Sequence, residues 1–178
     1  GKYSMHVAAA TTSSANIDAT WLRGPVTVRP RVARAELFNA VRGTFVDPER
    51  FWQPTDFPPV ENSTYETEDG GEQFIRDIEL PFTTNVSRAQ RISKIHLEKS
   101  RQGITVELPC NFKALSLAVW DVISLTIDKF GWTNKEFRVL EWRLSGDMGI
   151  DLILQEESSA AYSWSSGDAT TYDPAPDT

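Results

Sequence analysis

A single amphipathic segment, residues 87–102, restricts the folds open to this chain more than any other feature. At 100° per residue, its apolar and small side chains fall on one side of a helix and most of its charged side chains on the other. Asn85 or Ser87 can accept the free N–H groups at its start, and Gly103 can end it in a left-handed conformation. The pattern predicts one helix of about four turns, which packs on the β-structure or on the strand at 74–82. The packing side comprises Ala89, Ile92, Ser93, His96, Leu97 and Ser100.

The opposite side of this helix is basic, which raises the question of nucleic-acid binding. The whole chain has a formal net charge of −7 and a pI of about 4.9. An acidic protein repels a phosphate backbone. We therefore expect no specific nucleic-acid binding, and we expect the basic side to meet solvent or the carboxylates of neighbouring subunits. Its cationic residues are Arg88, Arg91, Lys94 and Arg101, with Lys99 on the flank of the helix.

Short runs of alternating polarity predict β-strands on both sides of the helix. Residues 36–47 indicate a strand kinked near Gly43, and residues 74–82 alternate cleanly. After Gly103 such runs recur at a spacing of about ten residues, which is typical of a small antiparallel barrel or sandwich. The predicted fold class is α+β: mostly antiparallel β-structure with a small barrel or sandwich and one long amphipathic helix. The later runs cover 104–110, 112–127, 137–146 and 150–157, with a hairpin over 128–137 whose tip is Thr133-Asn134-Lys135, and a turn at 146–149.

Composition divides the chain into three parts. Residues 1–35 are an N-terminal segment that belongs either to this core or to the remnant of a neighbouring domain, since the start Gly-Lys-Tyr favours a piece of a longer protein. Residues 36–157 form the main module, with its β-barrel over 103–157. Within it, residues 47–73 contain four prolines and no regular period, so they are predicted as a long loop. Residues 158–178 are rich in Ser, Thr, Pro and Asp, and are predicted as a flexible tail or linker.

Three features could in principle form a metal-binding or catalytic site, but the surrounding sequence disfavours each of them. The acidic turn 66–72 could hold calcium, but its spacing does not match an EF-hand loop, so a solvated turn is favoured. His96 has no partner in the pattern and is interpreted as a packing residue. Cys110, the single cysteine, is interpreted as a buried thiol. The sequence therefore predicts no catalytic, cofactor-binding or metal-binding residue, no cofactor, and no membrane span.

Five tryptophans, spread over predicted loops and strands, bear on the question of what the chain binds. They could stack nucleic-acid bases on a barrel surface, but residues 120–157 hold eight Asp and Glu against four Lys and Arg, which disfavours such a groove. Tryptophan is also favoured at the centre of protein–protein interfaces. We expect core packing for some of the five and protein contact for others. They are Trp52, Trp120, Trp132, Trp142 and Trp164.

Three stretches of the chain resemble one known family. They are ELFNAVRGTFVDP with WQPTDFPPV and the following DGG turn, RDIELPFTTNVSRAQRISKIHLEKSRQGITVELP, and VWDVISLT with FGW and KEFRVLEW. These motifs resemble the tail tip attachment, or central tail hub, proteins of long-tailed bacteriophages (the J-type phage tail protein family), over roughly residues 1 to 157. Trp120 stands where the family motif leads us to expect a glycine, so the geometry of that turn is left open.

The resemblance implies a structural virion protein and not an enzyme. It implies a hub module at the distal tail tip, made in the host cytoplasm, that supports host attachment and DNA delivery. The implied partners are further copies, as a homotrimer of the full-length protein, other tail tip and tail tube proteins, and a host receptor reached through domains outside this chain. Two alternatives stay open: a receptor- or carbohydrate-binding module that uses exposed tryptophans and the loop 47–73, and a cell-wall hydrolase with two acidic residues in a groove.

Overall fold

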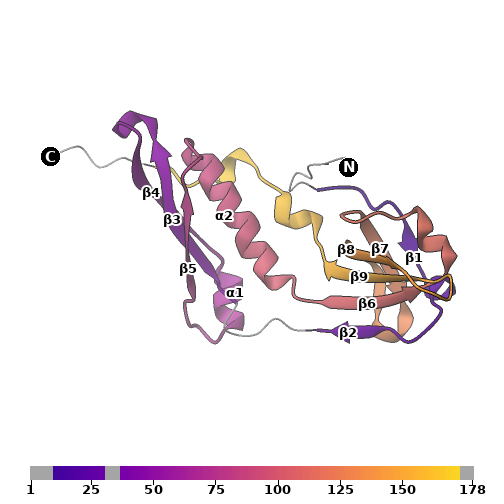
Figure 1. The fold of residues 1–178 in the computed structure, drawn as a ribbon. Helices are drawn as coiled ribbons and strands as arrows, with labels where there is room; N and C mark the ends of the chain where they lie inside the picture. The colour runs from indigo at the N-terminus through magenta and orange to yellow at the C-terminus, as the bar shows by residue number, and fades with distance from the viewer. Residues whose placement is uncertain (1–9, 31–36, 173–178) are drawn as a thin grey trace. The chain divides into compact units, whose positions relative to one another are not determined.

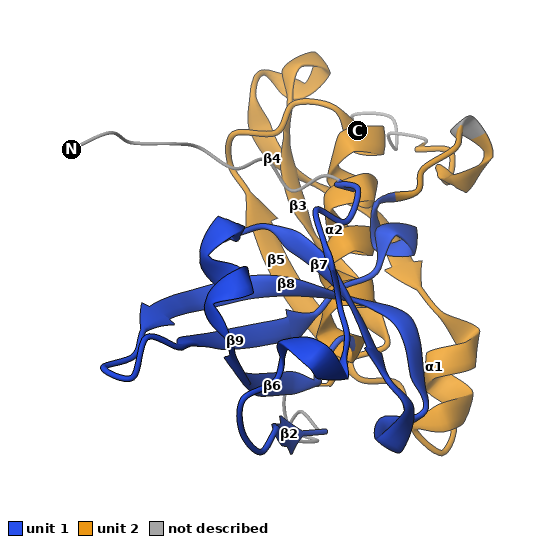
Figure 2. Cartoon of the chain, turned by 90° about the vertical axis from the view of Figure 1, so that its right-hand side faces the viewer, with its two compact units in different colours: residues 1–32, 102–162 blue, residues 33–101, 163–178 orange. Residues whose placement is uncertain are grey.

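The computed structural model describes residues 10–30 and 37–172, and the chain divides into two compact units (Figure 1, Figure 2). Unit 1 contains the described part of residues 1–32 together with residues 102–162. Unit 2 contains the described parts of residues 33–101 and 163–178. Each unit has its own β-sheet. Among the described residues, no helix is both long enough and apolar enough to cross a membrane.

Unit 1 is built on a six-stranded sheet with the strand order β1-β7-β8-β9-β6-β2. β1 runs parallel to β7, and the other neighbouring strands are antiparallel. β1 and β2 lie at opposite edges and do not pair within the described residues, so the sheet stays open and the predicted barrel is not formed. The strands are β1 (Asn16–Ile17), β2 (Thr27–Arg29), β6 (Thr105–Cys110), β7 (Val122–Ile127), β8 (Trp132–Leu144) and β9 (Ile150–Glu156).

One face of this sheet forms the main apolar core. Along β6 the side chains of Val106, Leu108 and Cys110 are buried, whereas Glu107 between them is partly exposed. This alternation follows from the two-residue period of a strand with one buried face. Short 3-10 helices join or follow the strands: η1 (Ala19–Trp21), η4 (Phe112–Ser116), η5 (Asp128–Phe130) and η6 (Ser159–Tyr162).

Unit 2 combines a three-stranded sheet, in the order β4-β3-β5, with the long helix α2 (Figure 1). β3 and β4 form an antiparallel hairpin, and the chain then passes through the short helix α1 and returns as β5, parallel to β3. Phe45, Phe57 and Ala89 form the buried apolar cluster between sheet and helix. The elements are β3 (Ala40–Asp47), η3 (Pro48–Arg50), β4 (Gln53–Glu61), α1 (Ser63–Glu68), β5 (Ile75–Leu80), α2 (Val86–Arg101) and η7 (Ser166–Asp168).

The predicted α+β fold class is confirmed, and the predicted helix is confirmed to within one residue at each end. Its face assignment is correct for Ala89 and Leu97, which are buried, and wrong for His96, which is exposed. Gln90 is buried instead, because its side-chain amide donates to Thr170 O at 2.9 Å and accepts from Thr170 N at 2.8 Å. The helix packs mainly on β3 and β4, whereas the sequence pattern pointed to the β-structure after Gly103 or to the strand at 74–82.

The long loop expected over residues 47–73 is wrong, because this segment contains β4 and α1. The prolines of β4 hide its period, yet they are tolerated because, among the described strands, β4 is an edge strand that pairs with β3 alone. α1 begins at Asn62, whose Oδ1 accepts from Thr64 N at 3.0 Å and from Tyr65 N at 3.3 Å. An ordinary N-cap therefore starts a helix where composition indicated irregular structure.

The flexible tail expected after residue 157 is wrong for the described residues 158–172. Ala161 and Tyr162 are buried in unit 1, and the ring of Tyr172 packs edge-on against Phe45 in unit 2, with 5.6 Å between the centroids. The chain passes from unit 1 to unit 2 after residue 162. Residues 173–178 lie outside the described residues.

Two further expectations concern short segments. The hairpin tip predicted at Thr133-Asn134-Lys135 is wrong, because the turn between β7 and β8 lies at Asp128–Gly131 and Gly131 takes a φ of 67°. The kink predicted near Gly43 is confirmed by a register shift between Val41 and Gly43. In the segment 1–35, β1 and β2 belong to the sheet of unit 1, while residues 1–9 and 31–36 lie outside the described residues. That the segment is the remnant of a neighbouring domain stays a prediction.

Candidate interaction site

The turn between β3 and β4 lies at one end of the unit 2 sheet (Figure 1), and it carries two exposed aromatic residues. Phe51 is 84% exposed and Trp52 is 64% exposed. Phe82, which is 97% exposed, lies at the same end of the sheet, since Val46 N donates to Thr83 O there at 2.9 Å. We call Phe51, Trp52 and Phe82 the aromatic tip. Exposed apolar groups gathered in this way mark an interaction surface.

The backbone of the aromatic tip is held in an unfavourable conformation. Phe51 and Trp52 have φ angles of 52° and 62°, a left-handed region that costs about 1–3 kcal/mol for such residues. The buried Asp47 fixes the turn: its Oδ1 accepts from Glu49 N at 2.9 Å and its carbonyl accepts from Trp52 N at 3.0 Å. Tyr172 donates its hydroxyl to Asp47 Oδ2 at 3.3 Å. The two aromatic side chains are therefore presented by a fixed turn.

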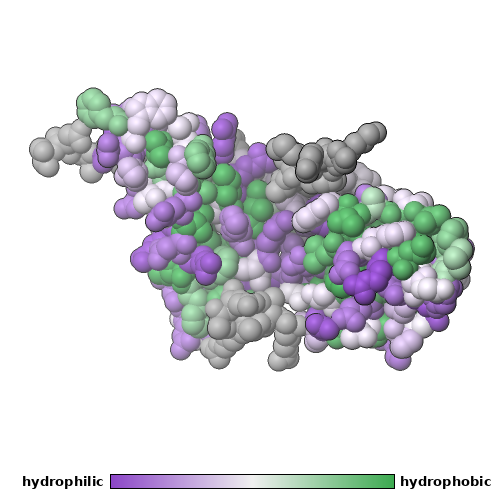
Figure 3. All heavy atoms as spheres, in the orientation of Figure 1, coloured by the Kyte–Doolittle hydropathy of each residue, from purple (hydrophilic) through white to green (hydrophobic). Residues whose placement is uncertain are grey.

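Unit 1 carries an apolar depression of about 330 Å³ beside η4, which we call the apolar hollow. Phe112 and Trp120, which stand before and after it in the chain, are 50% and 47% exposed. Figure 3 shows hydrophobic residues gathered over the part of unit 1 that contains η4 and the loop after it. The apolar hollow is lined by Leu115, Leu117, Ala118, Val119 and Trp142.

The backbone conformation at Trp120 explains why the family motif leads us to expect a glycine there. Its φ of 78° lies in the region that glycine favours, so tryptophan occupies a conformation suited to the expected glycine. Trp120 N donates to Val139 O at 2.8 Å, and Trp120 O accepts from Arg138 Nη1 at 3.2 Å. Asp121 Oδ2 also accepts from Ala118 N at 2.9 Å, so the turn is fixed from both sides.

Backbone strain and exposed apolar side chains coincide in this chain. The described residues other than glycine with positive φ are Phe51, Trp52, Trp120, Asn134 and Met148, and all except Asn134 are exposed hydrophobic residues. Strain of this kind persists where the surrounding structure imposes it, and it concentrates at functional sites. The aromatic tip and the apolar hollow are therefore the candidate functional surfaces.

The acidic turn 66–72 has a structural role that the sequence did not reveal. The carboxylate of Asp69, 10% exposed, pairs with Arg101 Nη2 at 2.5 Å and accepts from Asn39 Nδ2 at 2.9 Å. The prediction of a solvated turn is thus wrong for Asp69. Within the described residues no three His, Cys, Asp or Glu side chains come together in a way that could hold a metal ion.

His96 and Cys110 belong to neither of the two candidate surfaces as defined. The side chain of His96 on α2 is exposed in part, and partial desolvation of the ring together with the nearby cations Lys99 and Arg76 lowers its pKa. Cys110 is fully buried in β6, and burial raises the pKa of its thiol to about 12. A protonated, enclosed thiol is a poor nucleophile, as its interpretation as a buried thiol required.

The core packing expected for some of the tryptophans is confirmed, and the protein contact expected for the others stays a prediction. Trp132 and Trp142 pack against the core of unit 1, and Trp142 Nε1 donates to Ala114 O at 3.3 Å. Trp164 is half-buried, with Lys94 Nζ 5.8 Å from its ring centroid. Trp52 and Trp120 are exposed and belong to the two candidate surfaces or their margins.

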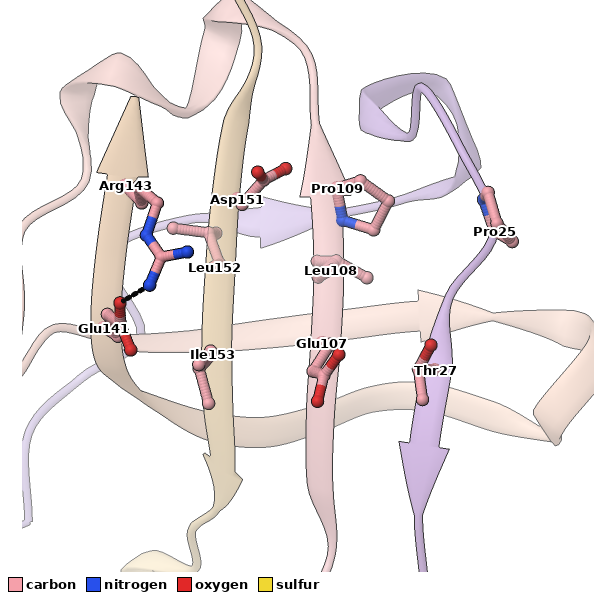
Figure 4. A pocket seen from close by; sticks show the side chains of 10 residues that line it. All are labelled: Pro25, Thr27, Glu107, Leu108, Pro109, Glu141, Arg143, Asp151, Leu152 and Ile153. Carbon is pink, nitrogen blue, oxygen red and sulfur yellow. Dashed lines mark hydrogen bonds and ion pairs between the residues drawn. The ribbon is translucent and has the colours of Figure 1, made fainter. Parts of the chain in front are cut away.

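A second depression, of about 280 Å³, lies on the outer face of the unit 1 sheet (Figure 4). Its three carboxylates are each paired with an arginine: Glu141 with Arg143 at 2.5 Å, Asp151 with Arg23 at 2.5 Å, and Glu107 with Arg29 at 2.6 Å. A glycosidase-type site needs one carboxyl group kept protonated as an acid, and pairing with arginine opposes that. This depression is therefore best explained as the charged outer face of the sheet.

Exposed apolar surfaces on a fixed scaffold are typical of proteins that contact other proteins. The family model described as "Putative phage tail protein" matches residues 5–142. The chain belongs to this family of phage tail proteins, which confirms the resemblance seen in the sequence. It is also 31% identical, over 121 residues, to the baseplate hub protein pb3 of Escherichia phage T5, covering 67% of this chain and 12% of that protein.

Two solved structures share the fold. A chain in the virion of the native gene transfer agent particle has a TM-score of 0.67 and 18% identity, covering 85% of this chain and 33% of that one. The 43 kDa tail protein of prophage MuSo2 from Shewanella oneidensis has a TM-score of 0.54 and 11% identity, covering 87% of this chain and 47% of that one. This chain thus spans less than half the length of each of these relatives.

Proposed function

We propose that this chain is a hub module at the distal tail tip of a long-tailed phage or prophage. In this role it is a structural part of the virion and not an enzyme. It assembles with further copies, as a homotrimer of the full-length protein, and with other tail tip and tail tube proteins. It supports host attachment and DNA delivery, and it reaches any receptor through domains outside this chain.

The observation that carries the proposal is the exposure of apolar side chains on strained, fixed turns in both units. Such surfaces are unfavourable in water unless another molecule covers them. The likeness to a baseplate hub protein supports the hub position, and membership of the phage tail family supports the virion.

The test is to label intact phage particles with antibodies raised against this chain and to view them by electron microscopy. We expect label confined to the distal end of the tail. Label along the whole tail would contradict the tip position, and unlabelled particles with the protein free in the lysate would contradict a structural role.

A receptor- or carbohydrate-binding role is the second candidate, because Trp52 and Trp120 leave aromatic surface open to solvent. Aromatic faces of this kind can stack on ligands. Binding of the isolated chain on a glycan array would favour this role over the structural one, and loss of that binding in Trp52→Ala would assign it to the aromatic tip.

A further inference from the structure

We propose that the free edge of β5 in unit 2 binds an extended segment of another protein, which adds a strand to the sheet and alternates basic with apolar side chains. The inference goes beyond the proposed hub function, because it specifies a partner by its chemistry and holds wherever in the tail the chain lies. It rests on the strand order β4-β3-β5, in which β5 is an edge strand (Figure 1). An exposed edge presents a row of N–H and C=O groups with which a further strand can pair.

The four edge strands of the two sheets differ in how far they are protected from such pairing. In unit 1, β1 has two residues and β2 has three, and edge strands this short offer little to pair with. In unit 2, β4 contains Pro54, Pro58 and Pro59, which have no N–H to donate. β5 has six residues and no proline. Among the described strands, β5 is therefore the edge that is open to pairing.

The register with β3 identifies the backbone groups at this edge. Ala40 pairs with Ile75 in a parallel ladder, and Ala40 N donates to Phe74 O at 3.1 Å. Because alternate residues of a strand point their N–H and C=O groups to opposite neighbours, Ile75, Asp77 and Glu79 direct theirs away from β3. Among the described residues, none of these three has a backbone hydrogen bond at that edge. Each leaves one donor and one acceptor for a further strand.

The side chains beside this edge are acidic on the outer face of the sheet, opposite to α2. A depression of about 460 Å³ on this face is lined by three carboxylates, those of Asp56, Asp77 and Glu79, and by a single basic residue among the described ones, Arg42. Arg42 pairs with Asp77 at 2.5 Å. Within the described part of the chain, neither Asp56 nor Glu79 makes an ion pair. Opposite charges on neighbouring strands stabilise their pairing, so Lys or Arg fits beside Glu79.

Beyond Arg76, the face of β5 towards α2 is apolar and only partly covered. Ile78 and Leu80 pack against the buried cluster of unit 2 but stay partly exposed, because α2 lies mainly over β3 and β4. Neighbouring strands place side chains of one face side by side, so apolar side chains of an added strand would cover both residues. A strand that meets both faces therefore alternates basic and apolar side chains, since its period is two residues.

A second copy of β5 does not meet these requirements. Antiparallel pairing in the registers centred on Asp77 or Ile78 sets Asp77 opposite the same aspartate or opposite Glu79 of the other copy. Like charges directly opposite each other destabilise a strand pair. The charges of β5 thus oppose self-association and favour a strand of opposite charge, so the partner is a segment with a different sequence.

Binding of a capped peptide of alternating Lys and Val to the full chain tests the inference. We expect the peptide to slow amide hydrogen exchange at Ile75, Asp77 and Glu79, measured by nuclear magnetic resonance, because their N–H groups gain acceptors. A peptide with Glu in place of Lys should bind more weakly. The Lys–Val peptide with every amide N-methylated should not bind, because it keeps the charges and loses the N–H donors.

Glu79→Lys reverses the charge at the edge and leaves the backbone groups in place. It should lower the affinity for the Lys–Val peptide about fivefold and raise that for the Glu–Val peptide, because an opposite-charge pair becomes a like-charge pair. The matched control is Glu49→Lys, which makes the same change of net charge at an exposed position in the turn between β3 and β4. At physiological ionic strength, where distant charges are screened, it should change either affinity far less. Thermal melts confirm that both variants are folded.

The inference is wrong if the Lys–Val peptide fails to bind up to its solubility limit, if the N-methylated peptide binds equally well, or if the slowed amides lie outside β5. Equal effects of Glu79→Lys and Glu49→Lys would overturn the selection by charge. The antibody labelling of particles tests the position in the tail separately. Label at the distal end without peptide binding would leave the hub function standing and reject the pairing at β5.

Discussion

The two units of this chain are stabilised in different ways. Unit 1 buries a cluster of fourteen apolar residues beneath a six-stranded sheet, whereas the corresponding cluster of unit 2 contains three, so unit 2 has far less apolar burial to draw on. Unit 2 also buries polar side chains, among them Asn39, Asp47, Gln90 and Ser93. The comparison teaches that unit 1 depends on apolar volume, and unit 2 on hydrogen bonds that fix its turns.

Asn39 shows how buried hydrogen bonds make up for the small apolar core of unit 2. Its Nδ2 donates to Asp69 Oδ2 at 2.9 Å and to Glu72 O at 2.7 Å, and its Oδ1 accepts from Phe74 N at 2.8 Å. One buried amide thereby fixes the acidic turn to the start of β5. Arg101 completes the network through Asp69, so the end of α2 is joined to the same turn.

The largest expected effect tests the apolar side of the comparison. Phe137→Ala in β8 removes a fully buried ring from the unit 1 core and should lower the free energy of unfolding by about 3–5 kcal/mol. Leu140→Ala on the same strand, where the side chain is 37% exposed, is the control and should cost much less. Urea unfolding followed by circular dichroism measures both. Equal losses would mean that burial does not set the stability of unit 1.

The polar side is tested by Arg101→Met, which removes one partner of the ion pair and leaves the carboxylate of Asp69, only 10% exposed, without its cation. The expected loss is about 3 kcal/mol, because an uncompensated buried charge is strongly destabilising. Adding Asp69→Asn should recover part of it. Arg91→Ala, at an exposed position of the same helix, should change the free energy of unfolding by less than about 0.5 kcal/mol. If both arginine variants behave alike, the network does not support unit 2.

A backbone contact in unit 2 gives a smaller effect. A Cβ at Gly43 would lie 1.8 Å from Ile78 O of the neighbouring strand, so Gly43→Ala must push β3 and β5 apart. Overpacking of this kind costs about 1–3 kcal/mol. The matched control is Gly146→Ala in unit 1, where a Cβ meets no heavy atom within 4 Å. Amide hydrogen exchange should show faster opening of β5 in Gly43→Ala, and unchanged exchange would contradict the predicted clash.

The smallest effects concern alkaline pH, where each unit holds one group whose pKa is raised to about 12. Burial raises the pKa of Cys110 in unit 1 to about 12. In unit 2, burial and the hydrogen bond to Glu98 raise the pKa of Tyr65 to about 12. Since both pKa values lie above those of the unfolded chain, the unfolded state releases these protons first and stability falls as pH rises, from about 8.5 for Cys110 and about 10 for Tyr65.

Substitution separates the two contributions. Cys110→Ala should flatten the decline of stability between about pH 8.5 and 10, while Tyr65→Phe should flatten it only above about pH 10. Urea unfolding at a series of pH values from neutral to alkaline measures the difference. A Tyr65→Phe profile that flattens below pH 10 instead would contradict the assignment of the raised pKa to this hydroxyl.

Sequence by itself determined the local elements of this protein. Helical period and cap residues placed α2 within one residue of its observed ends, and alternation placed β3, β5, β6 and β9. The kink at Gly43 and the buried state of Cys110 also followed from local pattern. These features are predictable because their causes, the 3.6-residue and two-residue periods and the conformational freedom of glycine, act within a few positions of the chain.

Only the tertiary structure decided which polar groups are buried and which irregular segments are fixed. Asp47 meets Tyr172 across 125 positions, and Asn39 meets Asp69 across 30. The residues next to each partner in the sequence do not indicate these contacts. Composition therefore gives a wrong prediction for the acidic turn, the proline-rich strand β4 and the segment 158–172. The aromatic tip depends on the same long-range contacts. A polar side chain is buried only where a distant segment supplies its hydrogen bond, because an unpaired buried group is too costly to keep.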